Sequence, residues 1–153
     1  MIAVALFAAS LIAWAILEAR ATSDDRPEQG TLALPTGLLL LAVHLTAVLD
    51  HLRGAHAGHA LVGVGVVLLA AGIALRLWSI ATLGPHFITA LRGATRVTAG
   101  PYRFTRHPSE VGLLLAAFGG ALLLGSLLAV LLATALIPVS IVRCRREDVA
   151  LGA

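Results

Sequence analysis

The sequence predicts an all-α, polytopic membrane protein of about five transmembrane helices, with residues 1–153 forming a single membrane domain. The 153-residue chain is 59% hydrophobic and only 12% charged, whereas a soluble domain is about 45–50% apolar and about a quarter charged. Its mean hydropathy is +0.95, and its apolar residues are gathered into long stretches. These observations exclude a soluble globular domain, a disordered chain, a disulfide scaffold and a nucleic-acid binder.

The first three predicted spans are separated by short polar segments. They cover residues 2–18, 32–49 and 60–83. We expect the N-terminal span to be retained, because the basic region of a cleaved signal peptide does not precede it. Pro35 stands near the first turn of the second span, where a missing N–H costs least.

The apolar run 111–143 is too long for one helix, since roughly 20 residues cross a bilayer. We therefore expect two helices, 111–124 and 126–142, that form a tight helical hairpin. Gly125 is the predicted turn and Ser126 the predicted N-cap.

Small residues recur every four positions along the fourth span, at Gly112, Ala116 and Gly120. Stripes of this kind let membrane helices approach closely. We expect packing within the bundle. A homodimer face is the alternative, so the sequence leaves monomer and homodimer undecided.

Arginine counts predict the orientation of the chain. All eleven basic residues are arginine, and nine of them lie in segments 20–30, 84–110 and 143–153, which share one face if there are five spans. The opposite face carries Arg53 alone. The positive-inside rule makes the arginine-rich face cytosolic, so we expect an integral protein of a bacterial inner (cytoplasmic) membrane with its functional segments 84–110 and 143–153 in the cytosol.

The geometry of the last two helices places charged residues together. His107 lies 18 residues before the predicted turn and Glu147 lies 21 residues after it, a mismatch of about 5 Å at the helical rise of 1.5 Å per residue. The mixed-charge cluster expected at this membrane face suits an amphipathic ligand with an anionic end and a cationic or hydroxyl-rich end. Its predicted members are Arg103, Arg106, His107, Glu110, Arg145, Arg146, Glu147 and Asp148.

Two sequence motifs resemble those of the isoprenylcysteine carboxyl methyltransferase family, and related membrane phospholipid methyltransferases carry a similar pattern. The stretch from Gly100 to Gly112, GPYRFTRHPSEVG, resembles the family signature G-P-Y-R-x-x-R-H-P-x-Y-x-G. The stretch from Arg143 to Leu151, RCRREDVAL, resembles the segment R-x-x-x-E-E-x-x-L that follows the last span. With the upstream match at Arg76-Leu77-Trp78, the resemblance covers roughly residues 61–151.

The resemblance implies an integral membrane methyltransferase that uses S-adenosylmethionine and releases S-adenosylhomocysteine. Its methyl acceptor would be a small or lipophilic molecule. Membrane lipid would be its other partner. A guanidinium from Arg103 or Arg106 suits the carboxylate of the cofactor. Glu147 and Asp148 suit its amino group or ribose hydroxyls. The remaining candidate cofactor contacts are Tyr102, for the adenine, and His107.

Glu110 stands where the family has tyrosine. Together with His107 and Arg106 it forms the predicted catalytic group, because a carboxylate can act as general base for a hydroxyl, amine or thiol. A carboxylate substrate such as prenylcysteine would need no base, and the carboxylate of Glu110 would repel it. Family members usually continue beyond Leu151 with an aromatic-rich segment, so we expect a more open site or a different lid.

Three further residues are candidate contacts for the substrate. His44 lies inside the second span, where a polar group is a functional candidate by default, although a hydrogen bond between helices is the simpler interpretation. Arg76 and Trp78 match the family pattern just before the signature. Arg76 can instead snorkel to the membrane surface.

We predict no metal site and no catalytic cysteine. One polar link has enough side chains to bind a metal ion, but it lies on the face opposite the predicted site. These side chains are Asp50, His51, His56 and His59. Cys144 is the single cysteine, so no internal disulfide forms.

Two alternatives to a methyltransferase remain open from the sequence. One is a membrane enzyme with different acid–base chemistry on the same fold, performed by Glu110 and His107. The other is a non-catalytic membrane protein that kept the fold and lost the C-terminal lid. Binding of S-adenosylhomocysteine separates both from the methyltransferase.

Overall fold

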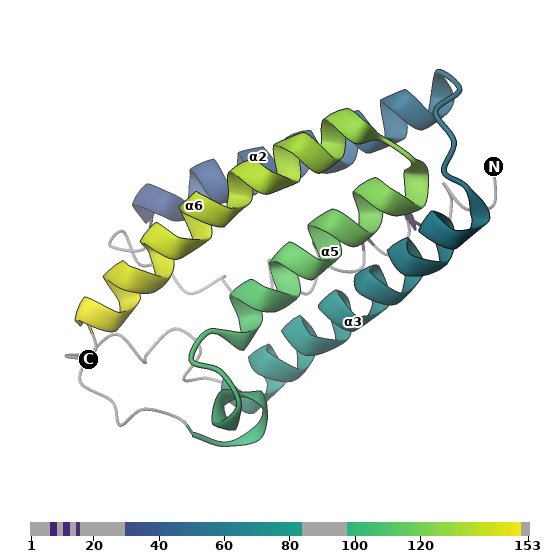
Figure 1. The fold of residues 1–153 in the computed structure, drawn as a ribbon. Coiled ribbons are helices and arrows are strands. Elements are labelled where there is room, and N and C mark those ends of the chain that lie inside the picture. The colour runs from purple at the N-terminus through teal and green to yellow at the C-terminus, as the bar shows by residue number, and fades with distance from the viewer. Residues whose placement is uncertain (1–6, 9–10, 13–14, 16–29, 84–97, 151–153) are drawn as a thin grey trace.

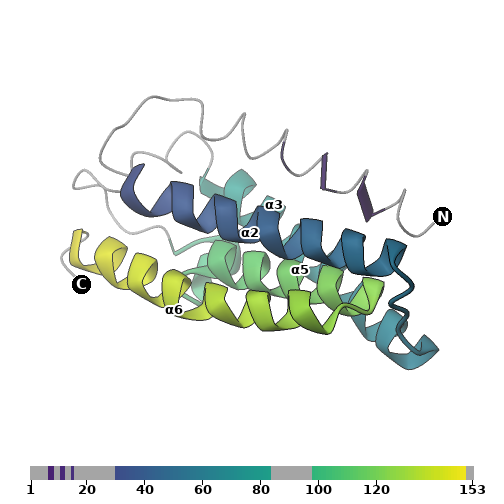
Figure 2. The same ribbon diagram turned by 90° about the horizontal axis from the view of Figure 1, so that it is seen from above.

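A computed structural model describes residues 7–8, 11–12, 15, 30–83 and 98–150 of the chain. Its long helices lie side by side as a bundle (Figures 1 and 2), and the described part contains no strand. This confirms the all-α prediction. The elements are α2 (Gly30–Leu52), α3 (His59–Leu83), the 3₁₀ turn η2 (Gly100–Arg103), α5 (Pro108–Leu124) and α6 (Leu127–Ala150).

The helices are longer than the predicted spans. α2 begins two residues early, so Pro35 lies inside the helix rather than in its first turn. α5 begins at Pro108, where the proline ring favours a helix start. α6 continues through its arginines and acidic residues to Ala150, because arginine and glutamate are good helix formers. The predicted cytosolic segment 143–153 is therefore largely helical.

Three of the described helices are long and apolar enough to cross a membrane: Pro35–Leu52, His59–Leu83 and Leu127–Val149. The helix Pro108–Leu124 is equally apolar but shorter. The structure thus supports a membrane protein without confirming five spans. Most of the predicted first span 2–18 lies outside the described residues, as do residues 84–97 and 151–153.

Glycines bring α3 and α5 into the closest helix–helix contact of the described bundle. A Cβ atom on Gly72 would lie 2.5 Å from the backbone nitrogen of Ala116, and one on Gly119 would lie 2.3 Å from that of Leu69. The backbones touch where side chains are missing, which is how small residues drive association of membrane helices. This confirms packing within the bundle for the small-residue stripe. Gly120, however, faces Phe7 rather than α3.

The turn between α5 and α6 forms as predicted. Gly125 has φ of 74°, a left-handed conformation that caps α5. The hydroxyl of Ser126 accepts a hydrogen bond from the Ala129 N–H at 3.0 Å, which confirms the N-cap. The same hydroxyl donates to Asp50 Oδ2 at 2.6 Å, tying this turn to the end of α2.

Beyond the turn, α5 and α6 diverge toward the C-terminal end of α6 (Figure 1). α5 packs mainly on α3, and α6 packs more on α2 than on α5. The glycines of α5 explain this preference, because they make α3 its closest neighbour. A tight hairpin is therefore not confirmed.

Candidate active site

The candidate site lies at the end of the bundle where α5 begins and α6 ends. η2 lies beside the C-terminal part of α3 at this end (Figure 1). The turn after Leu124 lies at the opposite end of α5. The topology thus brings the two motif segments, 100–112 and 143–150, to the same end.

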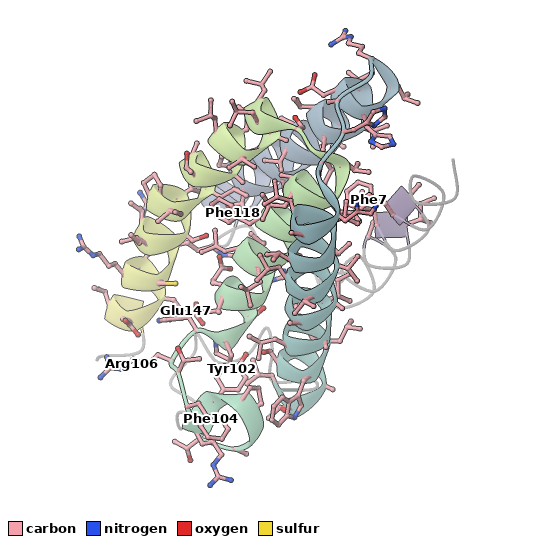
Figure 3. The ribbon with its side chains drawn as sticks, turned by 45° about the vertical axis from the view of Figure 1, so that its right-hand side comes forward. Phe7, Tyr102, Phe104, Arg106, Phe118 and Glu147 are labelled. Atoms are coloured by element: carbon pink, nitrogen blue, oxygen red, sulfur yellow. The ribbon has the colours of Figure 1, made fainter. Side chains whose placement is uncertain are left out.

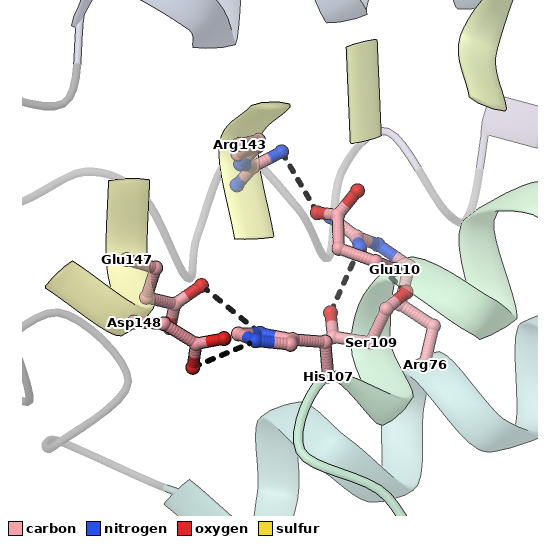
Figure 4. Close-up of polar contacts among 7 residues, drawn as sticks. All are labelled: Arg76, His107, Ser109, Glu110, Arg143, Glu147 and Asp148. Carbon is pink, nitrogen blue, oxygen red and sulfur yellow. Dashed lines mark hydrogen bonds and ion pairs between the residues drawn. The ribbon is translucent and has the colours of Figure 1, made fainter. Parts of the chain in front are cut away.

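His107 links the two motif segments. It is the N-cap residue of α5, and its ring nitrogens face two carboxylates on the last turns of α6 (Figure 4). Nδ1 lies 3.4 Å from Glu147 Oε2, and Nε2 lies 3.2 Å from Asp148 Oδ1. This contact was predicted from the helix lengths, and the structure places all three residues together.

Glu110 and Arg143 form a second bridge between α5 and α6. Arg143 Nη1 lies 3.0 Å from Glu110 Oε1, as Figure 4 shows. Glu110 is only 7% exposed, and its other oxygen, Oε2, has no hydrogen-bond partner among the described residues. The ion pair thus places a carboxylate inside the bundle, and its second oxygen is buried without a partner among the described residues.

Arg76 supports the start of α5. It is 2% exposed, and its Nη1 donates to the Ser109 carbonyl at 3.1 Å and to the Ser109 hydroxyl at 2.8 Å. A guanidinium is well suited to this fork-like contact. Arg76 therefore anchors Ser109, which lies two residues after His107 and directly before Glu110. In this way it helps to position both of these side chains. Trp78, by contrast, is 51% exposed.

Tyr102 packs against the C-terminal part of α3. Its side chain lies near that of Ser79. Burial raises the pKa of Tyr102 to about 12, and the negative charge of Glu147 adds to the shift. The phenol thus stays neutral at physiological pH and lies within electrostatic reach of α6.

The two predicted carboxylate-binding arginines are exposed. The Arg103 guanidinium lies over the Phe104 ring, 5.2 Å from its centroid. Arg106 follows three residues later, outside η2, and lies at the same end of the bundle as Tyr102 and Glu147 (Figure 3). Of the two, Arg106 directly precedes His107 and is the better placed to reach a ligand bound there.

A cavity of about 230 Å³ opens between α5 and α6 beside these residues. His107, Glu110 and Asp148 form its polar wall, and the other side is mainly apolar. The remaining lining residues are Thr105, Val111, Leu114, Ile137, Ser140, Ile141, Cys144 and Arg145. The arrangement offers carboxylates, an imidazole and an apolar surface within one space.

His44 lies apart from this cavity. Its Nδ1 donates to the Leu40 carbonyl at 2.7 Å, and its ring lies 5.6 Å from that of Phe7. It faces Gly120 of α5, thirteen residues or about 20 Å along the helix from His107. The structure therefore does not bring it together with the other candidate residues.

Arg143 and Ser140 were missing from the predicted site. Arg143 was read only as part of a motif, although it is four residues before Glu147 and so shares a helix face with it. Ser140 stands at the equivalent spacing before Cys144 inside the apolar run. The spacing was a usable signal, but it does not by itself show which face of α6 turns toward α5.

The sequence matches a model of a known protein family. The model described as phospholipid methyltransferase matches residues 60–151, more than half of the chain. The chain belongs to the phospholipid methyltransferase family. This family shares a broad superfamily of membrane methyltransferases with the isoprenylcysteine carboxyl methyltransferases, and the more specific resemblance is not confirmed. Searches of curated proteins and of solved structures found no match.

The matched range runs from the start of α3 through the motif segments to the end of α6. It therefore contains both bridges between α5 and α6, His107 with its two carboxylates and Glu110 with Arg143. The family indicates a membrane methyltransferase, and it does not specify the methyl acceptor.

Proposed function

We propose that this chain is a membrane methyltransferase that uses S-adenosylmethionine and acts on a small or lipophilic acceptor at the cytosolic face. The observation that carries the proposal is the contact of His107 with Glu147 and Asp148, which joins the two motif segments of a phospholipid methyltransferase family member. The contact makes an acidic wall at the end of the bundle, and two of its residues, His107 and Asp148, line the cavity between α5 and α6.

The residues at this wall fit the chemistry of S-adenosylmethionine. Glu147 and Asp148 are partly exposed, so their oxygens can accept hydrogen bonds from an amino group or from ribose hydroxyls. Arg106 offers a guanidinium for the carboxylate. The apolar lining of the cavity suits the less polar parts of the molecule. Tyr102 stands nearby as a flat, neutral side chain.

When bound, S-adenosylmethionine supplies a methyl group carried on a positively charged sulfur. The residues of the chain would contribute orientation and the exclusion of water, which are the main requirements of such a transfer. Glu110 supplies a fixed anion at the cavity wall. We infer that it favours an acceptor with a hydroxyl, amine or thiol over a carboxylate such as that of prenylcysteine.

The membrane arrangement of the protein follows from the same proposal. We infer five spans, with residues 2–18 as the first and α5 as a short fourth span held against α3. The site end of the bundle would then face the cytosol of a bacterial cell, where most of the arginines lie. A soluble methyl donor reaches the site from that side, and a lipophilic acceptor reaches it from the bilayer.

Transfer of a labelled methyl group tests the proposed function. Membranes containing the protein, incubated with S-adenosylmethionine tritiated on its methyl group, are expected to yield labelled product that membranes lacking the protein do not. Asp148→Asn is expected to lower the yield, while Asp50→Asn, the same change at the opposite end of the bundle, is expected to preserve it. Equal labelling with and without the protein, in both lipid and water-soluble fractions, would overturn the proposal.

A further inference from the structure

Two residues that line the cavity between α5 and α6 each carry a buried polar atom with no hydrogen-bond partner among the described residues: Glu110 Oε2 and Ser140 Oγ. Ser140 is only 3% exposed and Glu110 only 7%. Both residues line the same cavity, one from each helix. Buried polar groups are nearly always hydrogen-bonded, so this pair indicates a ligand that completes it.

The hydroxyl of Ser140 differs from those of Ser79 and Thr82 on α3. Ser79 donates to the Leu75 carbonyl at 2.7 Å, and Thr82 donates to the Trp78 carbonyl at 2.8 Å. This bond to the preceding turn is the usual way for a helical serine or threonine to satisfy its hydroxyl. Ser140 does not make it. Ser140 nevertheless belongs to the lining of the cavity between α5 and α6.

The chemistry of the two atoms defines the group that they accept. A carboxylate oxygen only accepts hydrogen bonds, and a serine hydroxyl both donates and accepts. A ligand that satisfies both must therefore carry at least one N–H or O–H. Arg143 occupies the other oxygen of Glu110, which leaves Oε2 to the ligand. A carboxylate ligand would be repelled, and an ether could not donate to Glu110.

The apolar part of the cavity defines the rest of the ligand. Val111, Ile137 and Ile141 line it and are all partly exposed on the outside of the bundle. In a membrane, this surface contacts lipid tails. An alkyl chain can lie along these residues while its polar head reaches inward, to Glu110 and Ser140.

We propose that Glu110 and Ser140 together bind the head of an amphiphilic methyl acceptor, a hydroxyl or amine on an alkyl body, and select it over carboxylates and ethers. The term acceptor rests on the proposed function. The binding itself is a property of the α5–α6 cavity and needs no methyl donor. Ser140 is thus a specificity-determining residue in the middle of an apolar helix.

Cys144 provides a direct readout of this binding. It is the only cysteine of the chain, it lines the same cavity, and it lies one helical turn after Ser140. In nanodiscs, the rate of its alkylation by N-ethylmaleimide is expected to fall when 1-decanol or decylamine is added. Decyl methyl ether and decanoate, which match the chain length but not the head group, are expected to protect poorly.

Matched variants show whether the two polar atoms are responsible. Ser140→Ala and Glu110→Gln are each expected to raise the decanol concentration for half-protection about fivefold, the loss expected from one hydrogen bond. Thr134→Ala removes a hydroxyl from the exposed side of α6, where it donates to the Leu131 carbonyl, and is expected to leave protection unchanged. Each rate is compared with that of the same variant without ligand, which corrects for changes in the thiol itself.

Equal protection by decanol and decyl methyl ether would overturn the proposal, because filling an apolar cavity would then be sufficient. Unchanged protection in Ser140→Ala would also overturn it. Failure of methyl transfer with selective protection intact would instead contradict the proposed function and leave this binding pair standing. The hydroxyl and the amine are distinguished by whether decanol or decylamine protects at the lower concentration.

Discussion

His107 Nε2 lies 3.2 Å from Asp148 Oδ1, although the two residues are 41 positions apart in the chain. One is the N-cap residue of α5 and the other lies in the last turns of α6. α5 and α6 diverge from their connecting turn, so this contact bridges the gap at its wider end. His107 and Asp148 both line the cavity at that end.

Removing the imidazole is expected to loosen the end of α6. In His107→Ala, Glu147 and Asp148 lose their contact with α5, and the last turns of α6 are left without that support. Hydrogen–deuterium exchange is expected to accelerate in residues 144–150 and to stay unchanged in residues 127–140. Unchanged exchange throughout α6 would show that the bridge does not hold the helix end.

The ion pair of Glu110 and Arg143 is expected to matter through its balance of charge. Arg143→Gln leaves an uncompensated carboxylate in the bundle, which we expect to cost about 2 kcal/mol of unfolding free energy, less than for a fully buried pair because Arg143 is partly exposed. The double variant Glu110→Gln/Arg143→Gln is expected to recover most of this loss. Unfolding in mixed micelles of increasing SDS content measures both, and additive losses would contradict the pairing.

Much of the fold could be predicted because the bilayer imposes simple rules on length and composition. The described helices α2, α3, α5 and α6 lie where apolar stretches predicted them, and Gly125 and Ser126 mark the turn as expected. Their exact ends could not be predicted, since Arg143 and its polar neighbours extend α6 by helix propensity rather than by hydrophobicity. Packing partners were also missed, because apolar stretches alone do not show that α5 prefers α3.

The site was predicted in outline for a related reason. Helix length alone placed His107 beside Glu147 and Asp148. The rotation of α6 about its axis decides that Arg143 pairs with Glu110 and that the Ser140 hydroxyl has no partner among the described residues. The sequence of a nearly uniform apolar helix does not reveal this rotation. Arg103 stays a predicted contact for the cofactor, and the sequence did not show that its guanidinium lies over Phe104.

Close contact between α3 and α5 predicts opposite outcomes for two glycines of the same helix. Gly72→Ala is expected to cost about 1–3 kcal/mol, because the new methyl group would meet the α5 backbone. Gly63→Ala is expected to be tolerated, since a Cβ there would meet nothing within 4 Å. The SDS unfolding assay compares them, and equal losses at both positions would argue against the α3–α5 interface.

Tyr102 is expected to titrate late. It is the only tyrosine of the chain, so the ultraviolet absorbance of tyrosinate reports this residue alone. We expect a midpoint at about pH 12 in the folded protein and about pH 10 after denaturation.

The raised pKa of Tyr102 also has a consequence for stability. The folded state holds the phenol proton more tightly than the unfolded state, so the contribution of Tyr102 to stability is constant below about pH 10 and declines as the pH rises toward about 12. A folded midpoint equal to the denatured one would show that the phenol is not buried against α3.

Binding of S-adenosylhomocysteine to the intact chain tests the central claim most directly. Isothermal titration calorimetry of the protein in nanodiscs is expected to show saturable binding of one molecule per chain. Asp148→Asn is expected to weaken it about tenfold, the effect of losing a charge-assisted hydrogen bond, and Asp50→Asn to leave it unchanged. Absence of saturable binding to the wild-type chain would contradict the assignment of a methyl-donor site to the end of the bundle where His107 meets Glu147 and Asp148.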